Sequence, residues 1–173
     1  MEATRAQAIQ ILEHGYAAVR DLMAKLPAPG KTLPGIGGGE WSAKDLIGHL
    51  ASWEGYALQA LEAWGNDEGA PIDKAVYGRG TNVVNAEAVA AKAPLGLSQV
   101  VHDADATHAE LIAAIRAMSD ERWERPATSR GRKPLGYRLG GILGGPAGGF
   151  RHAEAHLKGL EAFVQEQTSL APS

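Results

Sequence analysis

The sequence predicts an all-α protein built as a four-helix bundle, and three observations support this. First, 45% of its 173 residues are hydrophobic but only 6% are aromatic, and such a composition favours helices over strands. Second, apolar side chains recur at steps of three and four in four segments, which is the spacing of a buried helix face. Third, glycine and proline clusters separate these segments, as loops require. A bundle follows from four such helices.

The first helix is predicted over residues 3–26. Its apolar stripe comprises Ile9, Leu12, Tyr16, Val19, Met23 and Leu26. Two prolines and a glycine follow within four positions, and proline cannot continue a helix. Residues 28–40 contain five glycines and two prolines and are therefore predicted to form a connecting loop.

The second helix is predicted over residues 43–64. Ser42 is a suitable N-cap, and Asp45, three positions later, can complete a capping box. The stripe of this helix comprises Leu46, His49 or Leu50, Trp53, Ala57, Ala60 and Trp64. A glycine and an asparagine then end the helix.

The third helix is predicted over residues 98–118, after an irregular connection. Glycines and a proline interrupt the first half of that connection, and residues 85–92 are compatible with a short helix. The stripe of the third helix comprises Val101, Ala104, His108, Leu111, Ile115 and Met118. Residues 119–134 are charged and contain two prolines, so we expect a solvated loop.

The fourth helix is predicted over residues 150–165. Between 135 and 149, three pairs of glycines are compatible either with a weak helix followed by a turn or with a loop. The end of the chain, residues 167–173, is expected to fray. We expect one domain over residues 1–173, and the long connections leave the up-down order of the helices open.

Composition excludes several classes of function. With 17 basic and 20 acidic residues the net charge is −3, which gives no reason to expect binding to nucleic acid or an anionic membrane. The absence of cysteine excludes thiolate catalysis, cysteine-ligated zinc and disulfides. No apolar run approaches the roughly 20 residues that span a bilayer, and the start MEATRAQAIQ does not resemble a signal peptide. We therefore expect a soluble cytoplasmic protein that acts on a small molecule.

Three histidines fall on faces that are predicted to be buried. His152 and His156 are four residues apart and thus share a helix face, which continues into large apolar residues. His49 lies on the stripe of the second helix. Three neutral imidazoles can hold a divalent ion such as Zn²⁺ or Ni²⁺ and leave a position open for water or substrate. The alternative is that the pair on the fourth helix forms ordinary hydrogen bonds at the bundle surface.

Other polar residues give weaker signals. His108 also lies on an apolar stripe, either as a hydrogen-bonded core histidine, which we favour, or as a fourth ligand that would close the site. His14 and His102 are predicted to lie at the surface. Glu54 and Tyr56 are weak catalytic candidates at a pocket mouth, although solvated helix positions explain them as well. The glycine pairs match no phosphate-binding motif.

The segments WSAKDLIGHLASWE (Trp41–Glu54) and HAEAHLKGLEAF (His152–Phe163) resemble the DinB superfamily. Within the superfamily, these segments are most similar to the branch of ClbS/DfsB-like proteins. The segment Asn85–Ile115 also resembles this family. The resemblance implies an up-down-down-up four-helix bundle and a homodimer. It also implies a divalent metal held by one histidine of the second helix and two of the fourth, which correspond here to His49, His152 and His156.

Characterised members of the superfamily include thiol S-transferases that use mycothiol or bacillithiol, a maleylpyruvate isomerase, and a protein that opens the cyclopropane of colibactin. The resemblance therefore implies a metal-dependent enzyme that acts on a small electrophile by thiol transfer or hydrolysis, in detoxification or self-protection. A low-molecular-weight thiol would then be a second cofactor. Two alternatives stay open at this stage: a ligand-sequestering protein without turnover, and a metal-free ClbS-like hydrolase.

Overall fold

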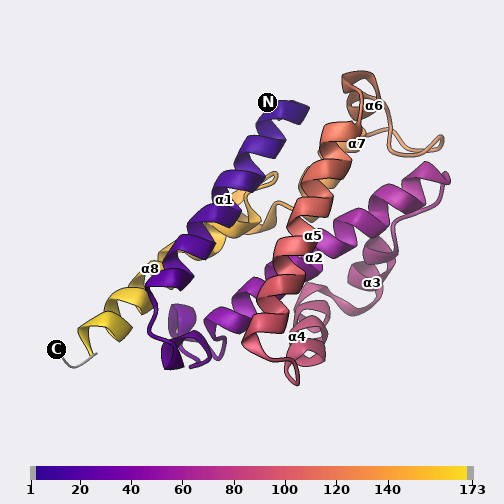
Figure 1. The fold of residues 1–173 in the computed structure, drawn as a ribbon. Helices are drawn as coiled ribbons and strands as arrows, with labels where there is room; N and C mark the ends of the chain where they lie inside the picture. Colours follow the sequence, from indigo (N-terminus) through magenta and orange to yellow (C-terminus); the bar gives the residue numbers. More distant parts are fainter. Residues whose placement is uncertain (1–2, 171–173) are drawn as a thin grey trace.

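The computed structural model describes residues 3–170; helices joined by loops make up this range, and it contains no strand. Of the α-helices in residues 3–170, four long ones form the bundle and four shorter ones lie around it (Figure 1). Their bounds are α1 Arg5–Lys25, α2 Ala43–Gly65, α3 Pro71–Arg79, α4 Thr81–Lys92, α5 Leu97–Ala117, α6 Asp120–Glu124, α7 Leu135–Ile142 and α8 His152–Ser169. The all-α prediction is thus confirmed.

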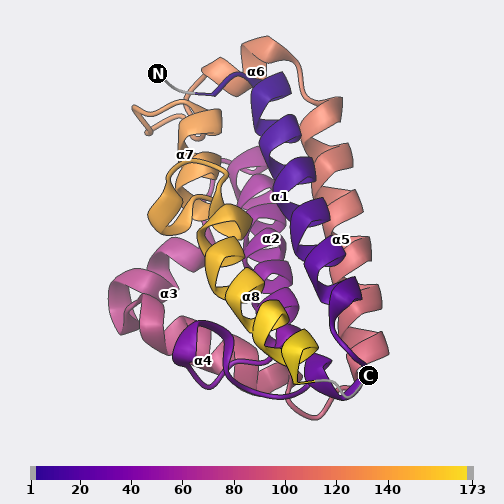
Figure 2. The ribbon, with the colours of Figure 1, turned by 90° about the vertical axis from the view of Figure 1, so that its left-hand side faces the viewer.

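The long helices α1, α2, α5 and α8 pack around a common interior. Helix α1 contacts both α5 and α8, and α2 packs along α5. Helices α3 and α4 contact α2 and lie on the flank of the bundle, whereas α6 and α7 cover the end at which α1 begins (Figure 2). Over residues 3–170, no helix is long and apolar enough to cross a bilayer.

The structure contains capping boxes at the starts of α1 and α2 and the predicted buried stripe of α1. The side chain of Ser42 accepts a hydrogen bond from the Asp45 backbone, and the Asp45 side chain accepts one from the Ser42 backbone. Thr4 and Gln7 form a second capping box at the start of α1. These pairs satisfy backbone N–H groups that the first helical turn leaves free. Every member of the predicted apolar stripe of α1 is buried.

Several predictions for the connections need correction. The segment 119–134 is not simply a solvated loop, because it contains α6 and the buried Trp123. Helices α3 and α4 occupy most of the irregular connection before α5. For the glycine-rich segment, the first of the two alternatives is confirmed, because helix α7 is followed by the turn Gly145–Ala147. Helix α8 continues to Ser169, so residues 167–169 of the predicted frayed tail are helical, whereas 171–173 lie outside the described residues.

The apolar core consists of two clusters that divide near the middle of α2. Leu46, Ile47 and Leu50 belong to one cluster, together with the second half of α1 and the apolar face of α8. Ala57, Ala60 and Trp64 belong to the other, together with α7 and the first half of α1. The buried polar side chains on this part of α2 include His49, directly before Leu50, and Glu54, between the two sets. The polar interior of the molecule therefore lies at the junction between two apolar clusters.

Candidate metal centre

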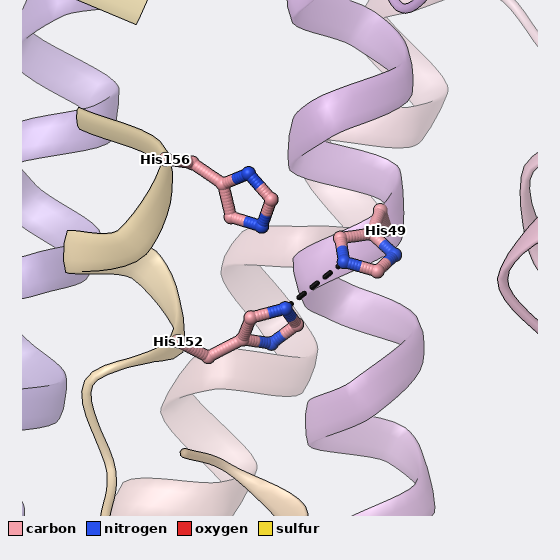
Figure 3. Close-up of side chains that lie close together, drawn as sticks. All are labelled: His49, His152 and His156. Carbon is pink, nitrogen blue, oxygen red and sulfur yellow. Dashed lines mark hydrogen bonds between the residues drawn. The ribbon is translucent and has the colours of Figure 1, made fainter. Parts of the chain in front are cut away.

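Three histidines from two helices meet at this junction. His49 projects from α2, and His152 and His156 project from α8, so that the three rings face one another (Figure 3). One nitrogen from each ring lies within 4.8 Å of the others. His49 Nε2 and His152 Nε2 are 2.9 Å apart, and only 1% of the surface of His49 is exposed. The structure brings together the three side chains that the sequence analysis singled out.

The spacing of the nitrogens is close to what a divalent ion requires. A tetrahedral ion bonded to imidazole at 2.0–2.1 Å places its ligand nitrogens about 3.3 Å apart, between the shortest separation and the 4.8 Å limit of this cluster. His156 Nε2 is buried and has no hydrogen-bond partner among the described residues. A buried nitrogen without a partner is costly, and a metal ion would satisfy it. The donor set thus fits a divalent metal.

The electrostatic environment keeps the three imidazoles neutral. Burial lowers the pKa of His49 to about 3, assisted by the neighbouring rings and by Lys92. Burial also lowers the pKa of His152 to about 4, with a further contribution from His156. The pKa of His156 is lowered by burial as well. Neutral imidazole is the form that binds metal, so these rings can bind metal at neutral pH without first losing a proton.

Aromatic side chains fix the orientation of the rings. The Trp41 ring lies 4.6 Å from that of His49 and 6.3 Å from that of His156, measured between centroids. Trp53 meets His152 edge-on at 5.9 Å, and its indole Nε1 donates a 2.9 Å hydrogen bond to Asn85 Oδ1 in α4. Such contacts limit ring rotation, which positions ligands before an ion arrives.

The glycine-rich turn after α7 makes room for His152. Gly145 has a φ of +56° and begins the 3₁₀ turn Gly145–Ala147. A Cβ at this position would lie 2.9 Å from Cδ2 of His152, which is closer than side chains normally approach. Gly136 has a comparable packing role in α7, because a Cβ there would meet the Trp123 indole at 2.3 Å. These glycines permit close packing and form no phosphate cradle.

A cavity of about 780 Å³ opens beside the histidines. All three imidazoles line it, together with Trp41 and Trp53. The opposite walls come from α3, α4 and α7, and contribute Ile72, Val76, Tyr77, Asn82, Asn85, Tyr137 and Ile142. The lining is mostly apolar and aromatic, with a few amides and one ion pair, Asp73 with Arg138, as is usual for a small-molecule site.

Glu54 and Tyr56 do not line this large cavity. Glu54 is buried, contrary to the expected solvated helix position, and its Oε1 lies 2.8 Å from His108 Nδ1. Tyr56 packs edge-on against Trp53. His108 is therefore a hydrogen-bonded core histidine, as we favoured, and it is not part of the three-histidine cluster. His14 and His102 are exposed, as predicted.

Local sequence patterns did not predict the wall that faces the histidines. Tyr77 and Asn82 come from the part of the connection that was expected to be irregular, and Asn85 begins the segment that was compatible with a short helix. One signal was available, because the run from Thr81 to Lys92 contains neither glycine nor proline and alanine-rich segments of this kind favour helix. Its position against α2 depends on long-range contacts that no local pattern reveals.

Comparisons with known proteins agree with this architecture. A family model described as "Mycothiol maleylpyruvate isomerase N-terminal domain" matches residues 9–138; this match includes His49 but ends before His152 and His156. A solved structure, that of an uncharacterised protein from Escherichia coli UTI89, superposes with a TM-score of 0.74 over 95% of each chain at 11% sequence identity. That level of identity supports the fold alone. No curated protein matches the chain.

Proposed function

The chain belongs to the family described as the mycothiol maleylpyruvate isomerase N-terminal domain, a DinB-like family, and we propose that it is a metal-dependent enzyme that adds a small thiol, or water, to a small electrophile. The proposed setting is detoxification or self-protection. The observation that carries the proposal is the convergence of His49, His152 and His156 at the floor of a mostly apolar cavity.

The residues of this chain indicate which cofactors such an enzyme would need, namely a small thiol and a divalent metal ion. The sequence contains no cysteine, so a thiol nucleophile has to come from a small molecule. A divalent ion held by the three imidazoles would supply Lewis acidity, which lowers the pKa of a thiol or water. The imidazoles bind through nitrogens that are neutral at pH 7, because burial lowers their pKa. Trp41 and Trp53 line the cavity beside them and give the reacting groups apolar surroundings.

The cavity lining favours an uncharged, partly apolar substrate. Trp41, Trp53 and Tyr137 provide flat apolar surfaces, and the Asn82 and Asn85 side chains lie among them as polar contacts. The guanidinium of Arg138 is already paired with Asp73, so this cation is not free to bind a substrate carboxylate. We infer that orientation of the substrate depends on aromatic packing and amide hydrogen bonds.

The position of Glu54 disfavours the metal-free hydrolase. That route needs a carboxylate or hydroxyl that orients water beside the substrate. Glu54 faces the bundle interior and contacts His108, and neither Glu54 nor Tyr56 lines the large cavity. The sequestering protein shares the same cavity and the same histidines, so turnover is the property that distinguishes it from the enzyme.

The experiment is a turnover assay on protein purified without a histidine tag. Metal-free protein and protein reconstituted with zinc or nickel are each mixed with mycothiol, bacillithiol or no thiol, and with a panel of epoxide, enone and cyclopropane electrophiles. We expect turnover that requires the metal and rises with thiol concentration. The His49→Ala/His152→Ala/His156→Ala variant should show no turnover above the uncatalysed rate.

Each alternative has its own signature in this assay. Turnover that survives chelation and persists in the triple variant would contradict the metal-dependent enzyme and favour the hydrolase. Stoichiometric binding of an electrophile without any turnover, under all metal and thiol conditions, would favour the sequestering protein. Measuring both binding and product formation on the same samples separates these outcomes.

A further inference from the structure

A second buried polar group lies behind the histidine cluster, in the interior between α1, α2, α5 and α8. Its centre is the carboxylate of Glu54, whose side chain is 9% exposed and whose Oε1 is 2.8 Å from His108 Nδ1. The His108 ring stacks on Tyr16 at 4.0 Å between centroids. The Tyr16 hydroxyl donates a 2.7 Å hydrogen bond to Asp105. One oxygen of Glu54 is therefore held in place by a chain of contacts that ends at the surface of α5.

The other oxygen of this carboxylate has no partner. Glu54 Oε2 is buried, and no group within residues 3–170 forms a hydrogen bond with it. Beside it is a small cavity of about 10 Å³, lined by apolar side chains and by three polar residues, Tyr16, Glu54 and His152. Because Oε1 is already paired with His108, Oε2 is the oxygen of Glu54 that can take a further hydrogen bond.

The cavity has the size and the chemistry of a site for one water molecule. A water needs roughly 10–15 Å³ of this kind of volume and two or more polar partners. Glu54 Oε2 is a strong acceptor without a partner, and His152 lines the same cavity. The Tyr16 hydroxyl is already committed to Asp105. Glu54 and His152 are thus the side chains best placed to bind such a water.

We propose that Glu54 is a positioning residue for the metal ligand His152, acting through one water molecule in this cavity. The water donates a hydrogen bond to Glu54 Oε2 and accepts one from the His152 Nδ1–H group. This proposal rests on the proposed metal site. Metal-binding imidazoles generally donate their second nitrogen to a carboxylate, carbonyl or water, which fixes the tautomer and makes the ligand more basic.

The tautomer that this arrangement requires agrees with the contact between the histidines. With its proton on Nδ1, His152 presents an unprotonated Nε2, and the 2.9 Å contact is then a hydrogen bond donated by His49 Nε2–H. The same His152 nitrogen is the one that faces the site of a metal ion. The carboxylate thereby prepares His152 to bind metal before the metal is present.

The test compares zinc affinity and the tautomer of His152 in untagged variants. Glu54→Leu removes the acceptor at similar volume, and we expect zinc to bind 10–100-fold more weakly, the range for loss of an outer partner. Glu54→Gln keeps the volume and an amide oxygen, and it should bind zinc at an intermediate level. Ser52→Ala is the matched control, because Ser52 is also a buried polar residue of α2 but does not line the small cavity. Its zinc affinity should stay within about threefold of wild type.

Nitrogen-15 NMR of the imidazoles provides the second readout, in metal-free protein. We expect His152 to be the Nδ1–H tautomer in wild type and in Ser52→Ala, and to shift toward Nε2–H in Glu54→Leu. Equal zinc affinities and equal tautomer populations in folded wild type and Glu54→Leu would overturn the proposal, even if the enzyme is active. If wild type binds no zinc, the proposed function fails, and the tautomer measurement still decides the role of Glu54.

Discussion

Helix α2 presents three buried polar side chains, and two of them, His49 and Glu54, differ in how their polar atoms are satisfied. One oxygen of Glu54, Oε1, has a direct partner, His108 Nδ1, at 2.8 Å, whereas its Oε2 has none within residues 3–170. His49 contacts His152, yet its own Nδ1 and the Nε2 of His156 are buried without partners in the described part of the chain. Both groups lie at the junction of the same two apolar clusters.

The comparison shows how a site differs from a structural polar contact. A buried polar group that is paired inside the chain contributes to folding, whereas buried nitrogens that converge without partners carry a cost that a ligand can remove. The large cavity opens on the histidine side of α2 and is not lined by Glu54 or His108. We therefore assign metal binding to His49, His152 and His156, and the support and orientation of that site to the pair Glu54 and His108.

The largest expected effect is the loss of a metal ligand. His156→Ala should weaken zinc binding more than 100-fold, because even an outer partner of a ligand contributes 10–100-fold. Zinc should then no longer raise the melting temperature of the protein, since stabilisation by a ligand follows its affinity. Titration against a competing chelator measures the affinity. His102→Ala, at an exposed histidine, is the control, and equal affinities in the two variants would remove His156 from the site.

The hydrogen-bonded pair of Glu54 and His108 should contribute mainly to stability. His108→Leu leaves Glu54 buried with neither oxygen directly paired, and we expect a loss of about 2 kcal/mol in the free energy of unfolding. The double variant Glu54→Leu/His108→Leu should recover part of this loss, because an apolar pair leaves no polar group without a partner. Urea unfolding at pH 7 measures both. A double variant that loses the full sum of the two single changes would contradict the pairing.

Acidification should act on the histidine cluster of the metal-free protein. In the folded state the pKa of His49 is about 3 and that of His152 about 4, both below the ordinary value of 6.5. Above pH 6.5 these rings are neutral in both states. Below pH 6.5 the unfolded chain takes up protons that the folded chain does not. The free energy of unfolding therefore decreases as the pH is lowered, by up to about 1.4 kcal/mol per pH unit for each ring.

Urea unfolding of metal-free protein at a series of pH values from 7 to 4.5 measures this slope. Replacing the three cluster histidines with glutamine should flatten the curve. An equally steep curve in that variant would show that other groups cause the acid sensitivity.

The smallest effect concerns the turn that packs on His152. Gly145→Ala places a Cβ 2.9 Å from Cδ2 of that ring and should weaken zinc binding about tenfold, or roughly 1.4 kcal/mol, by displacing the ligand. Gly148→Ala is the matched control, because Gly148 also has a positive φ but has no neighbour within 4 Å of the added Cβ. Both variants should lose stability from backbone strain, and Gly148→Ala should lose more because φ 93° with ψ −179° is a conformation that almost only glycine adopts, but only Gly145→Ala should lose affinity.

Much of the scaffold could be predicted from local patterns. The apolar stripes of α1, α2 and α5 and the capping box at Ser42 depend on residues within a few turns of one another. The face shared by His152 and His156 also follows from helical spacing. Such features are encoded locally, which explains why a single sequence is sufficient to recognise them.

The remaining features depend on contacts between residues far apart in the chain. The local sequence around Glu54 is typical of a solvated helix turn. Its side chain can nevertheless be buried, because it forms a hydrogen bond with His108, 54 positions later in the chain. Helix α6 is held by Trp123, whose indole packs on Gly136 and reaches the backbone of Ala3. The positions of α3 and α4 likewise depend on long-range contacts, since both helices pack against α2. Tertiary packing overrides composition in each case.

The central claim is that imidazoles from α2 and α8 converge on one ion, and diffraction data collected on both sides of the zinc absorption edge test it most directly. Crystals of untagged protein grown with zinc should show a single anomalous peak that is bonded to His49, His152 and His156 at about 2.0–2.1 Å. A peak that contacts only one of these rings, or no peak between α2 and α8, would contradict the account.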